Sequence, residues 1–223
     1  MAAKTQAILT KEQIGFLDLV SSEPYLCRNF YFTGGTPLAA FYLHHRLSED
    51  IDLFSEQEVK IIPIRTFLKK AQNKLGFKKI DYRQFLGLHT FQLFFSETNI
   101  LKVDFNYYPF PRIEPGKPYK NLSVDSEYDI AVNKVHMVVM KPRARDFIDL
   151  YFIMREKKYD WHDLLKQAEA KFDWHIDAVQ LGSRLLAAAD ATDYPRMLKP
   201  IKHEEWKQFF LDKAAKLKKN IFE

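Results

Sequence analysis

The hydrophobic and polar positions of this chain follow two periods, and each period predicts a different kind of element. Runs rich in aromatic and β-branched residues predict three strands, over 77–82, 85–95 and 100–107. The third run alternates, so Leu101 and Val103 would face one side of the strand and Lys102 and Asp104 the other. Apolar residues at helical spacing predict helices over 11–22, 36–45, 64–75, 126–140, 161–172, 175–189 and 204–219.

The order of these elements predicts an α+β fold with a small mixed sheet and helices, followed by a helical C-terminal region. Four prolines and Gly116 lie between residues 109 and 121 and predict a stiff connector there. We therefore expect a first domain over residues 1–115 and a helical region over residues 116–223, which would complete the active-site cleft.

Two adjacent glycines, Gly34 and Gly35, follow a short aromatic run that is typical of a buried strand. A turn made of glycine lets backbone N–H groups approach an anion without a Cβ in the way. Thr36 is expected to cap the helix that follows, and Pro37 suits its first position. The helix N-terminus would then point its free donors at the turn, which predicts an anion-binding site.

Acidic residues come next, in the sequence Asp50-Ile-Asp-Leu-Phe54. On a strand, Asp50 and Asp52 would share one face, where two carboxylates repel unless a cation lies between them. A divalent metal that holds a triphosphate is the natural candidate. Arg46, four residues before Asp50, could brace a carboxylate or contact phosphate.

The glycine turn and the Asp-x-Asp pair together resemble the signature of the DNA-polymerase-β-like nucleotidyltransferases. Gly34-Gly-Thr-x-Leu-Ala, followed by Tyr42-Leu-His-His-Arg-x-Ser-x-Asp-Ile-Asp-Leu-Phe54, is similar to one branch of them, the AbiEii/AbiGii toxin family. The resemblance implies a polymerase-β-like core. It also implies a third acidic residue on a later strand, for which Asp104 is the candidate; the alternative is a solvated edge aspartate.

A second block carries the resemblance to about residue 155. Lys134 lies in an apolar sector of its predicted helix, where a lysine either extends to solvent or reaches an anion. Arg143-Ala-Arg-Asp-Phe-Ile-Asp-Leu-Tyr151 then places Asp146 and Asp149 on one helix face. Asp146 and Asp149 are also favoured in a first helical turn by the helix dipole alone. We expect a positive partner for this acidic face, from Arg46, Arg143 or Lys134.

The resemblance implies a set of roles. Asp50, Asp52 and Asp104 would be metal ligands and, with Lys134 and Asp146, catalytic residues. The nucleotide-binding residues would be Gly34, Gly35, Thr36, Arg46, Lys134, Arg143 and Asp149. One or two Mg²⁺ ions, or Mn²⁺ in their place, would hold a nucleoside triphosphate. The acceptor would be RNA, such as a tRNA 3′ end, and a separately encoded antitoxin would control the toxin. The alternatives are a small-molecule or protein acceptor, and a non-catalytic relative that binds nucleic acid or a partner.

Composition changes this interpretation little. A single cysteine, Cys27, excludes a disulfide framework, and the absence of a leader-like N-terminus or a long apolar run predicts a cytoplasmic protein without a membrane anchor. The net charge of +5 permits a nucleic-acid partner. Two basic clusters stand out, one on the predicted helix 64–75 and one between Lys199 and Lys219. If the acceptor is RNA, at least one cluster should flank the carboxylates.

Overall fold

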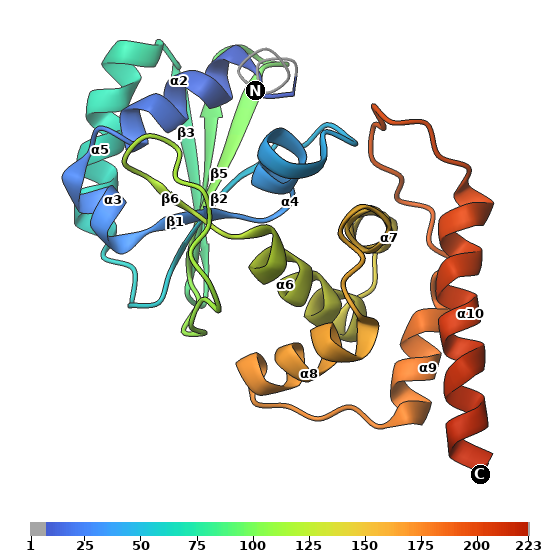
Figure 1. Ribbon diagram of the computed structural model, residues 1–223. Coiled ribbons are helices and arrows are strands. Elements are labelled where there is room, and N and C mark those ends of the chain that lie inside the picture. The colour runs from blue at the N-terminus through green and yellow to red at the C-terminus, as the bar shows by residue number, and fades with distance from the viewer. Residues whose placement is uncertain (1–7, 223) are drawn as a thin grey trace. The chain divides into compact units, whose positions relative to one another are not determined.

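The computed structural model describes the chain path over residues 8–222 and the side chains over residues 8–217 (Figure 1). The chain forms two compact units, of which the first ends at Ser126 and the second begins at Glu127. We call them the sheet unit and the helical unit. Among the described residues, no helix is both long enough and apolar enough to cross a membrane.

The sheet unit is built on a six-stranded sheet with the order β3-β4-β5-β2-β1-β6. Its strands are β1 Tyr31–Thr33, β2 Ile51–Ser55, β3 Lys79–Phe85, β4 Leu88–Phe94, β5 Ile100–Tyr107 and β6 Ser123–Val124. The sheet is mixed, as predicted: β2 and β5 are parallel, β1 and β6 are parallel, and the other neighbours are antiparallel.

One face of the sheet is apolar and covered by helices. Phe32, Leu53, Phe91 and Val103 alternate out of their strands into a single hydrophobic core. Helices α2 (Lys11–Val20), α3 (Pro24–Asn29) and α5 (Ile61–Leu75) supply the other side of that core and gather on one side of the sheet in Figure 1. The opposite face carries polar side chains.

The strands differ from the prediction at one turn. A two-residue turn at Leu86 and Gly87 joins β3 to β4, with Phe85 paired to Leu88. The expected break between residues 82 and 85 is wrong, because the first strand continues through Arg83 and Gln84. Gly87 lies in the turn, where an added Cβ would come within 2.9 Å of the Tyr107 side chain.

The boundary between the units lies later than the predicted division at residues 115 and 116. Ser123–Val124 adds a sixth strand beside β1, and Asp125 N donates to the Phe32 carbonyl oxygen over 2.9 Å. These pairings hold the proline-containing segment to the sheet, so it belongs to the first unit and does not act as a connector.

The helical unit contains α6 (Glu127–Met140), α7 (Ala144–Lys157), α8 (Trp161–Phe172), α9 (Ala178–Leu186) and α10 (His203–Phe222). Phe147, Trp206 and Phe210 form its aromatic centre, and the Trp206 and Phe210 ring centroids lie 5.9 and 4.8 Å from that of Phe147. A buried ion pair between Lys171 and Asp129, 2.8 Å apart, joins α8 to α6. Asp129 is therefore a structural residue of this unit.

Candidate active site

The glycine turn lies where β1 ends and a helix begins. Gly34 has φ +85°, a conformation that side chains with a Cβ rarely adopt, and Gly35 opens α4 (Gly35–Pro37). The helix continues as a π-helix, η1 (Leu38–Leu43), whose buried alanines join the core. A Cβ on Gly34 would lie 2.6 Å from Asp52 Oδ2, and one on Gly35 would overlap the Arg46 guanidinium. Both glycines are therefore required because predicted site residues approach the turn closely.

Thr36 does not cap the helix. Gly34 occupies the cap position, and the fully buried Thr36 hydroxyl donates to the carbonyl oxygen of Asp50 and lies 2.8 Å from Ser48 Oγ. The side chain thus fixes the loop that precedes β2. Thr36 can therefore contribute to the predicted nucleotide binding only through its backbone N–H, which belongs to the first helical turn.

Neighbouring strands bring the predicted carboxylates together on the polar face. Asp52 on β2 is the direct partner of Asp104 on the parallel strand β5 and of Thr33 on β1. Adjacent strands are about 4.8 Å apart, so these side chains are immediate neighbours. Asp104 thus lies beside Asp52, and with 6% of its surface exposed it is not a solvated edge residue.

Lys102 and Thr90 hold the Asp104 carboxylate. The Lys102 ammonium lies 2.8 Å from Asp104 and 3.3 Å from Asp50, and Thr90 Oγ1 donates to Asp104 over 2.6 Å. Burial lowers the pKa of Lys102, but the hydrogen bond to Asp104 and the charges of Asp104, Asp50 and Asp52 outweigh burial and raise it. Lys102 is therefore positively charged beside these carboxylates. Strand alternation in the sequence had already placed it on the same face as Asp104.

A further carboxylate, Asp125, was missed by the sequence analysis. It follows β6, is fully buried, and accepts a hydrogen bond from Thr33 Oγ1. The polar face thus carries the row Asp104, Asp52, Thr33, Asp125. Asp125 comes directly after the two-residue strand β6, which is too short to give a periodic signal.

The predicted ligands suit a hard divalent cation such as Mg²⁺, because Asp50, Asp52 and Asp104 offer carboxylate oxygens, which such ions prefer. Within residues 8–217, however, no three His, Cys, Asp or Glu side chains are already arranged as metal ligands. The Lys102 ammonium contacts two of the three predicted ligands instead. Metal binding would therefore have to compete with this lysine.

Arg46 is almost fully buried, which its position four residues before Asp50 did not predict. Its Nη1 donates to the Leu47 carbonyl oxygen over 2.9 Å, and its guanidinium packs against Gly35. The arginine therefore places a fixed positive charge beside the glycine turn.

The second predicted group belongs to the helical unit and forms a buried ion cluster. Lys134 on α6 lies 2.6 Å from Asp146 and 2.8 Å from Asp149, both on α7. Arg143 Nε, 3.2 Å from Asp146, adds a second cation. The expectation that the acidic face meets a positive partner is confirmed for Lys134 and Arg143. Asp146 and Asp149 are 1% and 0% exposed, so they do more than interact with a helix dipole.

The basic helix predicted over 64–75 does not flank the carboxylates. Ile64, Phe67 and Leu68 of α5 pack into the core against the apolar face of the sheet, opposite Asp52 and Asp104. Arg65 lies 5.0 Å from the Tyr82 ring centroid. Helix α5 is therefore not the cluster that flanks the carboxylates, because a helix that covers the apolar face cannot also line the polar one. The cluster from Lys199 to Lys219 stays a prediction, and the side chains of Lys218 and Lys219 lie outside the described residues.

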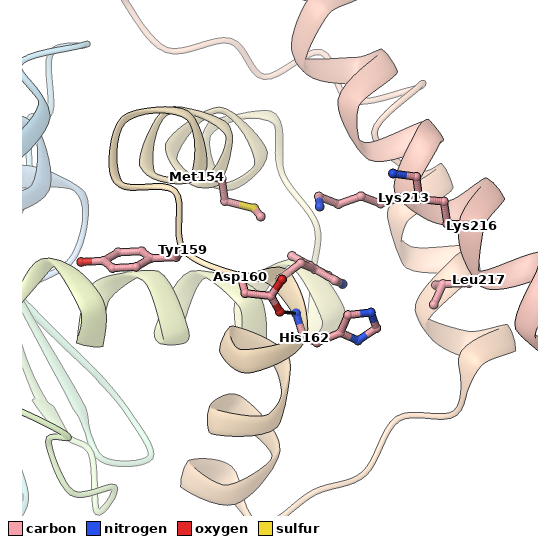
Figure 2. A pocket seen from close by; sticks show the side chains of 8 residues that line it. Met154, Tyr159, Asp160, His162, Lys213, Lys216 and Leu217 are labelled. Carbon is pink, nitrogen blue, oxygen red and sulfur yellow. Dashed lines mark hydrogen bonds between the residues drawn. The ribbon is translucent and has the colours of Figure 1, made fainter.

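In the helical unit, residues of α7, α8 and α10 line a hollow of about 330 Å³, and Lys213 and Lys216 of α10 are among them (Figure 2). Burial lowers the pKa of Lys213, the charge of Lys216 lowers it further, and Asp160 opposes both. The native state thus disfavours the charged lysine. The resulting loss of stability is fully present below the lowered pKa and is relieved as the pH rises towards the ordinary lysine value.

We therefore expect Lys213→Met to raise the melting temperature at about pH 7, with a smaller gain near pH 10. Part of the gain is offset by the rings of Phe209 and Trp161, 4.7 and 5.4 Å from the ammonium. Thermal unfolding of the wild type, this variant and Lys166→Met, an exposed lysine of α8, measures the effect. A lower melting temperature for Lys213→Met at neutral pH would contradict it.

Comparison with known proteins adds relatives over most of the chain. Residues 17–216 match the family model described as "Nucleotidyl transferase AbiEii toxin, Type IV TA system". Protein aq_aa25 of Aquifex aeolicus (strain VF5) is 32% identical over 168 residues, which cover 74% of this chain and 76% of that protein.

Two crystal structures from Helicobacter pylori share the fold. One, named as a candidate nucleotidyltransferase, has a TM-score of 0.62 at 15% identity and covers 95% of this chain and 97% of its own. The other, JHP933, has a TM-score of 0.60 at 15% identity and covers 95% and 94%. The fold, the row of aspartates beside the glycine turn and the family match agree: the chain belongs to the AbiEii family of nucleotidyltransferase toxins.

Proposed function

We propose that this nucleotidyltransferase moves a nucleoside monophosphate from a triphosphate to a hydroxyl at the 3′ end of an RNA, such as a tRNA, in a Mg²⁺-dependent reaction. A separately encoded antitoxin would control it, in keeping with the type IV toxin–antitoxin system named in the family's description. The observation that carries the proposal is the row formed by Asp52 and Asp104 beside Gly34.

The glycine turn is suited to the triphosphate. Backbone N–H groups at the start of a helix lack partners within that helix and favour an anion. The guanidinium of Arg46 against Gly35 adds a fixed positive charge at the same place. Gly34, Gly35, the backbone of Thr36 and Arg46 would therefore bind the phosphates, and the nucleotide-binding role of Lys134 and Arg143 stays a prediction from the family resemblance.

Asp50, Asp52 and Asp104 would hold Mg²⁺, or Mn²⁺ in its place. When bound, the ion would neutralise charge on the phosphates. In the apoprotein Lys102 supplies a positive charge to Asp50 and Asp104. Its contact with Asp50 is long and half-exposed, so we expect it to yield to the ion.

The transfer makes one bond and breaks one. The acceptor oxygen bonds to the α-phosphorus, the bond from that phosphorus to the bridging oxygen of the β-phosphate breaks, and pyrophosphate leaves. Asp104, held by Thr90 and Lys102, takes the proton of the attacking hydroxyl. Asp146 and Asp149 contact Lys134, and we assign these two carboxylates the role of fixing its position.

The test is incubation of the purified protein with each α-labelled nucleoside triphosphate, Mg²⁺ and total RNA. We expect label from one or more triphosphates to enter RNA, and no label to enter when a chelator replaces the metal. Label in a small molecule or in protein, with none in RNA, would support the alternative acceptors. No transfer to any acceptor would favour a non-catalytic binding role.

A further inference from the structure

A hollow of about 400 Å³ lies on the polar face of the sheet unit, beside the carboxylates. Strands β3, β4 and β5 form its floor, since Arg83 pairs with Thr90 and Gln92 pairs with Lys102 across the ladder. Five of its lining residues carry the argument: Arg83, Phe85, Thr90, Gln92 and Lys102. We call this surface the hairpin groove.

The hairpin groove is continuous with the predicted catalytic row. Thr90 and Lys102 both line it, and both contact the Asp104 carboxylate, over 2.6 and 2.8 Å. Asp104 is the residue expected to take the proton of the attacking hydroxyl. A molecule bound in the groove can therefore reach Asp104, where an acceptor must present its hydroxyl.

The groove carries the chemistry that binds single-stranded nucleic acid. Phe85, at the turn end, is 74% exposed, which is unusual for a large aromatic side chain and offers a face on which a base can stack. Arg83 is exposed and has no ion-pair partner among the described residues, so its guanidinium is available to a phosphate. Gln92 adds an amide that can donate to and accept from a base edge.

We infer that the hairpin groove binds the single-stranded 3′ end of the RNA acceptor, with the terminal nucleotide at Asp104 and a preceding base stacked on Phe85. The inference rests on the proposed function and names the surface that the acceptor uses. Helix α5 offers more positive charge, but it covers the apolar face of the sheet and cannot present a strand to Asp104. A double-stranded RNA is not the expected ligand, because base stacking on an exposed ring requires unpaired bases.

The test compares two double variants with matched changes in charge and apolar surface. Arg83→Glu with Phe85→Ser alters the groove. Lys70→Glu with Ile62→Ser makes the same kinds of change on α5, where Ile62 is 76% exposed. For each protein we would measure binding of a fluorescent single-stranded RNA of about ten nucleotides, binding of each nucleoside triphosphate, and the KM for the RNA acceptor.

The groove variant is expected to bind the RNA at least about ten-fold more weakly, with a correspondingly raised KM, because it can neither stack a base at position 85 nor neutralise a phosphate at position 83. Its log Kd should also vary less steeply with log salt, by about 0.7 for each phosphate that the variant no longer neutralises. Triphosphate binding should be unchanged, and the α5 variant should match the wild type throughout.

Three outcomes would overturn the inference: RNA binding unchanged in the groove variant, an equal weakening in the α5 variant, or weaker triphosphate binding in place of weaker RNA binding. The last outcome would make the groove a nucleotide site. Failure of the proposed function has a different signature. In that case the wild type transfers no nucleotide to RNA, whereas failure of the groove alone leaves transfer to RNA intact and insensitive to Arg83 and Phe85.

Discussion

Replacing Asp52 by Asn is expected to abolish nucleotide transfer while the sheet unit stays folded. The substitution keeps the volume of the side chain, which matters because Asp52 Oδ2 lies against Gly34. It removes a negative charge from a row in which Asp104 is the direct neighbour. Like charges on adjacent strands repel, so the fold should lose little stability, whereas the charge that would hold the metal and triphosphate is removed.

The expected decrease in transfer rate is at least about a hundred- to a thousand-fold, the usual effect of removing one electrostatic group from a reaction centre. Steady-state transfer and thermal unfolding should be measured on the same preparations. Glu97→Gln, an exposed acid of the sheet unit, is the matched control and should match the wild type in both. An Asp52→Asn protein that is folded and fully active would show that the row is not the catalytic centre.

Replacing Lys134 by Met is expected to destabilise the helical unit by about 3–5 kcal/mol, because one cation is removed from a buried pair of carboxylates. Asp146 and Asp149 would both stay buried, and Arg143 contacts only Asp146. Denaturant unfolding would measure the destabilisation, with Lys166→Met as the control.

A triple variant separates the structural role of Lys134 from a role in nucleotide transfer. Lys134→Met combined with Asp146→Asn and Asp149→Asn removes the cation together with the charges it neutralises, so most of the stability should return. If Lys134 also contacts the triphosphate, transfer should remain low in the restored protein. Transfer that recovers along with stability would return Lys134 to a purely structural role. A Lys134→Met protein within about 1 kcal/mol of the wild type would contradict the buried cluster itself.

The predicted carboxylates Asp50, Asp52 and Asp104 could be singled out from sequence because strand alternation is a local property. Two residues apart on a strand means the same face, which placed Asp104 and Lys102 together before any pairing was known. The parallel pairing that sets Asp104 beside Asp52 depends on contacts between distant segments. Only the resemblance to the family indicated that a later strand brings a third carboxylate to the pair.

Other parts of the site depend on contacts between distant segments. Thr36 was expected to cap a helix, but its hydroxyl bonds to the Asp50 carbonyl oxygen across a loop that had no predicted shape. Asp125 reaches the row only because a two-residue strand pairs with β1 some ninety positions earlier in the chain. The positive partner of Asp146 and Asp149 could be narrowed from sequence to Arg46, Arg143 or Lys134, yet only the packing of α6 on α7 brings Lys134 to both carboxylates.

The most direct test of the central claim uses one triphosphate carrying its label on either the α- or the γ-phosphate, with purified tRNA as acceptor. Transfer of a nucleoside monophosphate predicts that the α-label enters RNA, that the γ-label leaves as pyrophosphate, and that Asp52→Asn abolishes both. If the γ-label enters RNA, or the α-label enters RNA equally well with Asp52→Asn, the account of this site as a nucleotidyltransferase centre acting on RNA is wrong.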